Sequence, residues 1–298
     1  MYNGSQPNKS DIVATSEFCK KLYGEQVPKY TALLLNEKKR ILEKYPDKYL
    51  ERELSNFENK IISLMPMALC DSTLIDLGIK APDSLLAGLG MVTYHISPHD
   101  DIVDQPPNNN NAMAALLYAG NIVLLEGIES LLKNGHEKVM PSMLAAVREN
   151  HFRQQKIVDI LWQKRRPTSD EYQIGIKHII SFTMIGITTA LAYADKQNLE
   201  KEAWSFSEDY GMALQYFDDM SEIDEDQRNG YWSLPKIRAS EKGIEGFEKD
   251  RETKNLLISE LKDLAKEKVN HGKTCMKDFN AVQSNLSRLG KIINEFSY

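Results

Sequence analysis

Two acidic groups, each closing an apolar stretch, place the strongest constraint on how this chain can fold. The first, HDDIVD at residues 99–104, ends the apolar run 85–94. The second, DDMSEIDED at residues 218–226, ends another apolar stretch more than a hundred residues later. The carbonyl end of a helix carries partial negative charge, so acids there are disfavoured unless a positive charge compensates. We therefore expect a fold in which both groups share a cation.

The remaining sequence predicts helices throughout. Apolar residues recur at helical spacing, and no stretch shows convincing period-two alternation. The fold class is therefore all-α: a single-domain bundle of about ten helices, covering residues 11–298 after a disordered lead at 1–10. The segment 112–132 is expected to be buried on most faces because it is apolar almost all round. The expected helices cover 11–45, 49–69, 84–98, 112–132, 137–165, 168–194, 198–226, 243–269 and 273–296.

Composition excludes several function classes. A net charge of −6, with lysine and arginine spread along 298 residues, argues against nucleic acid or an anionic membrane as partner. The three cysteines are far apart and form no CxxC pair, which favours buried thiols in a reducing compartment. The apolar segments near 112–125 and 184–194 are interrupted by Asn121 or too short to span a bilayer. We expect a soluble, cytoplasmic protein without stable membrane insertion.

The spacing of the acids predicts a metal site. Asp100 and Asp104 lie four residues apart, on one face of a helix. Asp218, Glu222 and Asp226 continue the same spacing over two turns. Clustered carboxylate oxygens suit Mg²⁺, which substrate phosphates can complete. The alternative is that both groups are solvent-exposed helix faces, as most acidic runs are. Three observations argue against it: each group is attached to an apolar helix, each repeats the same spacing, and two such groups occur in one chain.

Both acidic groups resemble the paired motifs of one enzyme superfamily. HDDIVD is similar to the HDDxxD motif of trans-prenyl diphosphate synthases, and QYFDDMSE at 215–222 resembles their FQxxDDxxD motif, with Leu214 for Phe and Glu222 for the last Asp. Residues 225–235 resemble the segment after the second motif of phytoene and squalene synthases. The acidic stripe also has the spacing of the metal triad of class I terpene cyclases. These enzymes belong to the all-helical class I isoprenoid synthase superfamily, and the resemblance spans roughly residues 50–240.

The resemblance implies a central active-site cavity and a mechanism. Several Mg²⁺ ions would bind the diphosphate of an allylic prenyl substrate, and the C–O bond would ionise to a carbocation shielded from water. It also implies catalytic roles for Asp100, Asp104, Asp218 and Lys177, and allows a homodimer. The implied metal ligands are Asp100, Asp101, Asp104, Asp218, Asp219, Glu222 and Asp226.

Further side chains are candidates for substrate binding. The basic residues are expected to meet the diphosphate, and the aromatic and aliphatic ones to line the cavity for the hydrocarbon chain. Each has an ordinary alternative, as a surface charge or as core packing. The candidates are Lys177, Arg228, Lys236, Gln215, Phe182, Tyr210, Phe206 and Ile96.

One departure from the pattern bears on the reaction. Chain-elongating synthases bind isopentenyl diphosphate through basic residues in a GKRxRP segment and in an RRG after the first motif. Here NKIISL at 59–64 keeps only Lys60, and QPPNNNN at 105–111 contains no arginine. A second diphosphate needs cationic partners when it is desolvated. The interpretation therefore leans to a terpene synthase; an elongating or other prenyltransferase and a non-catalytic subunit are the alternatives.

Overall fold

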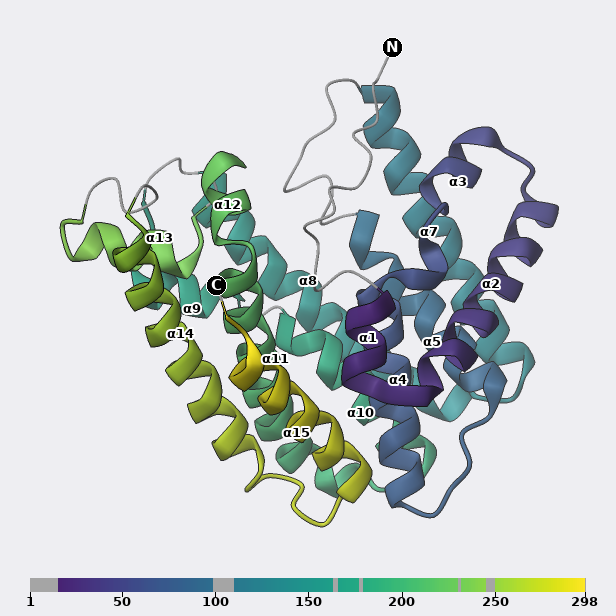
Figure 1. Cartoon of the computed structure of the whole chain (residues 1–298). Helices are drawn as coiled ribbons and strands as arrows, with labels where there is room; N and C mark the ends of the chain where they lie inside the picture. Colours follow the sequence, from purple (N-terminus) through teal and green to yellow (C-terminus); the bar gives the residue numbers. More distant parts are fainter. Residues whose placement is uncertain are drawn as a thin grey trace.

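The computed structural model describes residues 16–98, 110–162, 166–176, 179–229, 232–244 and 250–297, and these contain helices and no strands. The helices pack into one bundle (Figure 1). The all-α prediction is confirmed. The α-helices are α1 (Ser16–Tyr23), α2 (Val27–Lys44), α3 (Lys48–Glu53), α4 (Ile61–Asp76), α5 (Asp83–Tyr94), α7 (Asn110–Lys133), α8 (Met140–Trp162), α9 (Ser169–Ile176), α10 (Ile179–Tyr193), α11 (Glu200–Ser221), α12 (Ile223–Asn229), α13 (Leu234–Glu241), α14 (Arg251–Gly272) and α15 (Asn280–Glu295).

The centre of the bundle is formed by α4 and α10. Nearly all of 62–74 in α4 and all of 182–192 in α10 are buried, as expected for helices that are apolar on most faces. The two backbones approach closely at Gly186, where an added Cβ would lie 2.4 Å from the carbonyl oxygen of Pro66. Next to this centre, α11 packs against both α10 and α14.

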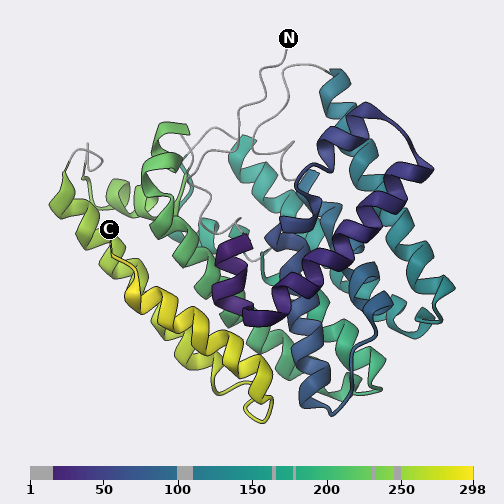
Figure 2. The ribbon, with the colours of Figure 1, turned by 45° about the vertical axis from the view of Figure 1, so that its right-hand side comes forward.

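The outer helices α14 and α15 run side by side (Figure 2). Each has one apolar face towards the core and a charged face outwards, as their amphipathic sequences predict. The N-terminus of α15 is capped from a distance, because the Asp76 carboxylate of α4 accepts hydrogen bonds from the N–H groups of Ala281 and Val282 at 2.8–3.1 Å. This cap fixes α15 to the central helix.

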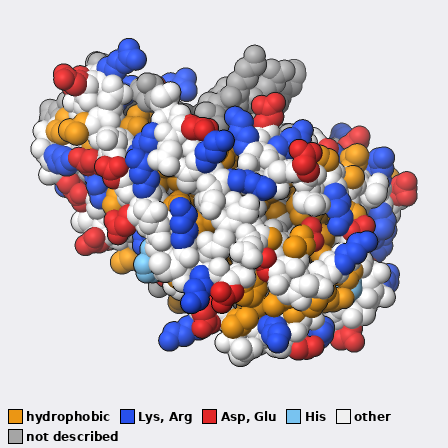
Figure 3. Space-filling model, turned by 60° about the horizontal axis from the view of Figure 1, so that its bottom comes forward, with side chains coloured by type: hydrophobic (Ala, Val, Ile, Leu, Met, Phe, Trp, Pro, Cys, Tyr) orange, Lys and Arg blue, Asp and Glu red, His pale blue; other side chains and the backbone are white. Residues whose placement is uncertain are grey.

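A buried carboxylate joins α2 to α7. Glu126 accepts hydrogen bonds from Arg40 at 2.6 Å, Lys44 at 2.6 Å and the hydroxyl of Tyr45 at 2.9 Å. Burial alone would raise the pKa of Glu126, but the three hydrogen bonds outweigh burial and the pKa is lowered. The ionised carboxylate therefore stabilises this contact. On the face drawn in Figure 3, by contrast, acidic and basic side chains are interspersed and no single sign dominates.

Several helix predictions were wrong in detail. The segment 11–45 is divided into α1 and α2 by a 3₁₀ helix at Gly24–Gln26, and α14 and α15 begin later than expected, at Arg251 and Asn280. The segment 49–69 is divided into α3 and α4 by a turn and a short 3₁₀ helix, and 198–226 is divided into α11 and α12 at Glu222. The prediction that 112–132 is buried on most faces fails, because α7 exposes a row of large apolar side chains. These are Leu117, Tyr118, Leu125 and Leu132.

The exposed row also bears on the membrane prediction. By length and composition α7 could cross a membrane, a property that core helices of soluble proteins share. In this structure it packs along α5 as part of the bundle. Gly127 allows the close contact, because a Cβ there would lie 2.9 Å from Cβ of Met91.

Candidate functional site

The second acidic group forms a stripe that continues across the boundary between α11 and α12. The N–H of Glu222 bonds to the carbonyl of Asp218 at 3.0 Å, and the N–H of Asp226 bonds to the carbonyl of Glu222 at 2.9 Å. These are α-helical i to i−4 bonds, so the three residues keep the one-face spacing although α11 formally ends at Ser221. All three side chains are partly exposed. The structure thus keeps three partly exposed acidic residues in helical register, and their part in binding a metal ion stays a prediction.

Asp219 occupies a different position from these three. Its side chain is buried and accepts several hydrogen bonds from three separate elements. The Tyr172 hydroxyl of α9 lies 2.7 and 2.9 Å from the two carboxylate oxygens. Gln215 Nε2 donates at 2.9 Å, and the N–H of Leu234, at the start of α13, donates at 3.3 Å. Asp219 therefore ties α9, α11 and α13 together beside the stripe.

The pKa values around Asp219 follow from this geometry. Burial raises the pKa of Asp219 to about 6, although the hydrogen bonds from Tyr172, Gln215 and Leu234 act in the opposite direction. Burial also raises the pKa of Tyr172, and the negative charges of Asp219, Asp226 and Asp218 raise it further. The Tyr172 hydroxyl thus stays protonated and remains a donor.

Gln215 contacts both adjacent acids. Its Nε2 lies 2.9 Å from Asp219 Oδ1 and 3.4 Å from Asp218 Oδ2. Within the described part of the chain its Oε1 is buried and has no hydrogen-bond partner. A buried amide oxygen of this kind costs free energy unless a donor reaches it. A water molecule bound to a metal ion beside Asp218 is a donor of the kind this oxygen needs, and an all-oxygen donor set fits Mg²⁺.

The basic candidates lie near the same end of α11. Arg228 is exposed and donates from Nε to the carbonyl of Asp224 at 3.2 Å. Lys236, in the first turn of α13, has Nζ 4.8 Å from the centre of the Trp232 ring. Sequence reasoning missed Lys254 of α14, whose largely buried side chain pairs with Asp224 at 2.5 Å and fixes α12 to α14. No local signal could have found a pair 30 residues apart.

The residues predicted to line the cavity for the hydrocarbon chain are all buried, but they do not all pack against the same part of the bundle. Phe182 and Ile96 lie in the core. Phe206 and Tyr210 stack with ring centres 5.7 Å apart, and the Tyr210 hydroxyl donates to that of Tyr23 in α1 at 3.1 Å. Tyr210 thus makes a core contact with α1, and its part in lining a cavity stays a prediction.

The first acidic group and Lys177 lie outside the described residues. Asp100, Asp101, Asp104 and Lys177 therefore stay predictions. Before the first acidic group, the structure describes the chain as far as Pro98. Two side chains shortly before Pro98 contact residues that are distant in the sequence. The Tyr94 hydroxyl donates to the carbonyl of Glu53 at 2.8 Å, and Nε2 of His95 lies 2.8 Å from Nε2 of His151 in α8. Sequence reasoning missed the histidine pair.

Comparisons with known proteins give similarity at the level of structure. No protein-family model matches the sequence. No curated protein matches it either. Among solved structures, a decaprenyl diphosphate synthase from Rhodobacter capsulatus is 13% identical and has a TM-score of 0.67, with 92% of this chain and 99% of that one covered.

Two further structures agree. A polyprenyl synthase from Caulobacter crescentus, complexed with calcium and isoprenyl diphosphate, is 15% identical with a TM-score of 0.63, and the match covers 95% and 98% of the two chains. A polyprenyl synthetase from Streptomyces coelicolor is 14% identical with a TM-score of 0.61, with 89% and 99% covered. The resemblance in the two motifs is thus matched by three-dimensional similarity over nearly the whole chain. The protein has the all-α fold of the class I isoprenoid synthases.

Proposed function

We propose that this protein is an Mg²⁺-dependent enzyme that ionises an allylic prenyl diphosphate. The observation that carries the proposal is the stripe of Asp218, Glu222 and Asp226, kept in register across a helix boundary beside a buried, fully hydrogen-bonded Asp219. Solvated acidic faces do not need such support. The similarity to prenyl diphosphate synthase structures agrees with this reaction class.

The residues have distinct roles in this proposal. Asp218, Glu222 and Asp226 would hold the metal ions together with Asp100, Asp101 and Asp104. Mg²⁺, when bound, neutralises the diphosphate and stabilises it as a leaving group. Lys177, Lys236 and Arg228 would add positive charge around the diphosphate, and Gln215 Oε1 would accept a hydrogen bond from a water ligand of the metal. Phe182 and Ile96 shield the hydrocarbon chain from water in a central cavity.

Chain elongation is the first reaction to test. The solved structures that resemble this chain are described as decaprenyl, polyprenyl and farnesyl diphosphate synthases, which favours a prenyltransferase over the terpene synthase preferred from the sequence. Terpene synthesis stays the second candidate because the arginines that elongating enzymes carry on both sides of the first acidic group are absent here. In the upstream segment 59–64 only Lys60, just before α4, is basic.

One incubation separates these reactions. The protein is given Mg²⁺ and geranyl, farnesyl or geranylgeranyl diphosphate, with and without isopentenyl diphosphate. Longer diphosphates that form only with isopentenyl diphosphate support elongation, and hydrocarbons or alcohols without it support the terpene synthase. Absence of turnover with every substrate, in a protein shown to be folded, refutes both and favours a non-catalytic subunit.

We also propose that the protein works as a homodimer in the reducing cytoplasm, through the exposed row on α7. Tyr118, Leu125 and Leu132 are exposed at intervals of seven residues, and Leu144 and Phe152 of α8 are exposed as well. A helical stripe with this period is typical of a helix–helix interface. Light scattering should give twice the mass of 34.0 kDa, and Leu125→Glu should give the monomer. A monomeric wild type refutes the interface. The three free cysteines agree with the compartment.

A further inference from the structure

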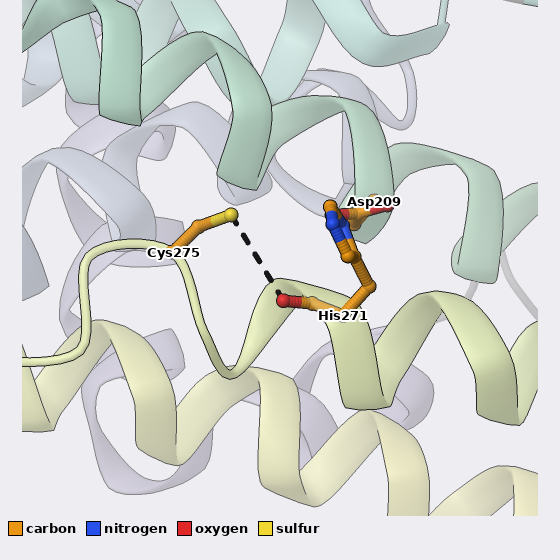
Figure 4. Close-up of side chains that lie close together, drawn as sticks. All are labelled: Asp209, His271 and Cys275. Carbon is orange, nitrogen blue, oxygen red and sulfur yellow. Dashed lines mark hydrogen bonds and ion pairs between the residues drawn. The ribbon is translucent and has the colours of Figure 1, made fainter.

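Three side chains of metal-binding chemistry meet where the end of α14 touches α11 (Figure 4). Asp209 belongs to α11, His271 to the last turn of α14, and Cys275 to the turn that follows. One ligand atom of each lies within 4.8 Å of the others. Asp209 precedes Asp218 by nine residues of helix, which places the two about 14 Å apart along the axis. The cluster is therefore separate from the acidic stripe.

The backbone around Cys275 is held in place by several contacts. Gly272 allows α14 to approach α11, because a Cβ there would lie 3.3 Å from Cβ of Asp209. Gln283 of α15 donates to the carbonyl of Cys275 at 2.5 Å. The next residue, Met276, has φ of +47°, a conformation that side chains other than glycine rarely adopt. These features hold the backbone of Cys275, and its thiol donates to the backbone carbonyl of His271 at 3.9 Å (Figure 4).

The carboxylate in this cluster is buried and lies between two basic side chains, Lys268 and His271. Asp209 is only 3% exposed. Its Oδ1 lies 3.5 Å from Nζ of Lys268, a long ion pair, and its Oδ2 faces Nδ1 of His271 at 2.5 Å. A buried carboxylate is costly unless it is paired or coordinates a metal. The His271 side chain is 63% exposed, so it can turn to admit an ion.

We propose that Asp209, His271 and Cys275 bind a divalent transition metal of the Zn²⁺ class. A thiolate with an imidazole and a carboxylate is a ligand set for Zn²⁺ and disfavours Mg²⁺. A water molecule completes the fourth position. Tetrahedral bonds of about 2.0–2.1 Å put neighbouring N and O ligands ~3.3 Å apart, so the contact between His271 and Asp209 opens by less than ~1 Å.

Binding exchanges a proton for the metal. Cys275 loses its thiol proton to solvent, and His271 binds through Nδ1 as the neutral imidazole with its proton at Nε2. The bound ion then links the end of α14 to α11, the helix that also carries Asp218. The site thus stabilises the scaffold of the acidic stripe and is independent of the proposed reaction.

Cobalt provides a direct test, because a thiolate bound to Co²⁺ gives a charge-transfer absorption band that carboxylate sites do not give. Full-length, metal-stripped protein is titrated with Co²⁺ in excess Mg²⁺, and the Co²⁺ is then displaced with Zn²⁺. We expect one equivalent of Co²⁺ with the band. Cys275→Ser should abolish the band, and His271→Asn should raise the apparent Kd for Zn²⁺ at least about tenfold. Lys273→Ala, an exposed change in the same turn, should alter neither.

Three results would overturn the proposal. They are the absence of the band in the wild type, its survival in Cys275→Ser, and unchanged Zn²⁺ affinity in His271→Asn. Circular dichroism checks that each variant is folded. Should Cys275→Ser unfold, His271→Asn decides alone, because its side chain is mostly exposed and its loss leaves the core intact.

Discussion

Replacing Tyr172 with phenylalanine removes one hydroxyl from the contact between α9 and α11. That hydroxyl donates to both oxygens of Asp219, at 2.7 and 2.9 Å. A hydrogen bond to a charged group contributes about 1.5–3 kcal/mol, and the lost partner here is buried. We therefore expect the free energy of unfolding to fall by about 2 kcal/mol at pH 7.5.

The loss should depend on pH. Burial raises the pKa of Asp219 from its usual 3.8 to about 6, so the folded protein keeps a proton that the unfolded chain releases between these values. The stability contributed by this group is fully present below pH 4 and is lost as pH rises through about 6; the difference is about 3 kcal/mol at ~1.36 kcal/mol per pH unit. Without the Tyr172 hydroxyl the pKa rises further. The penalty of Tyr172→Phe should therefore be smaller at pH 4.5 than at pH 7.5.

Urea denaturation followed by circular dichroism at the two pH values measures both effects. Tyr193→Phe is the matched control, since its ring contacts His136 and Lys138 but its hydroxyl has no hydrogen bond within the described residues. If Tyr172→Phe costs no more than Tyr193→Phe at pH 7.5, Asp219 is not held as described. An equal penalty at both pH values would refute the assignment of the raised pKa to Asp219.

Two further changes test the packing of the helical bundle. Gly186→Ala should lower the free energy of unfolding by about 2 kcal/mol or more, because the new Cβ meets the backbone of Pro66 and α4 and α10 must separate. The expected measurement is a shift of the urea midpoint to lower concentration. Glu126→Gln should cost about 1 kcal/mol at pH 7, since the paired Arg40 and Lys44 are more than a third exposed and screened. The pKa of Glu126 is lowered in the fold, so its contribution is present at neutral pH and is lost on acidification, and the penalty should shrink when unfolding is measured at pH 3.5.

Local patterns predicted the parts of the site that depend on helix geometry. The spacing of Asp218, Glu222 and Asp226 placed them on one face because i to i+4 neighbours coincide on any α-helix, and the backbone bonds across Glu222 preserve this. The paired motifs indicated the fold through their resemblance to a known superfamily. These features need only short-range order.

The features that escaped prediction are contacts over long sequence separations. Tyr172 lies 47 residues from Asp219, and Lys44 lies 82 residues from Glu126. No periodicity carries such pairings, so Asp219 looked equivalent to Asp218 in the sequence although one is buried and the other partly exposed. The sequence did not predict the exposure of α7. A helix that is apolar almost all round is expected to be buried, but its sequence does not say whether the rest of this chain or a second copy of the chain buries it.

The central claim is that the acidic stripe on α11 and α12 activates a prenyl diphosphate through Mg²⁺. Its most direct test is the release of inorganic diphosphate from farnesyl diphosphate, measured against Mg²⁺ concentration for the wild type and for Asp218→Asn. Asp263→Asn serves as the control, because Asp263 is an exposed acid on α14. We predict Mg²⁺-dependent release that falls at least about a hundredfold in Asp218→Asn, about 2.7 kcal/mol of transition-state stabilisation, and is unchanged in Asp263→Asn. Equal release by wild type and Asp218→Asn at every Mg²⁺ concentration would contradict the account.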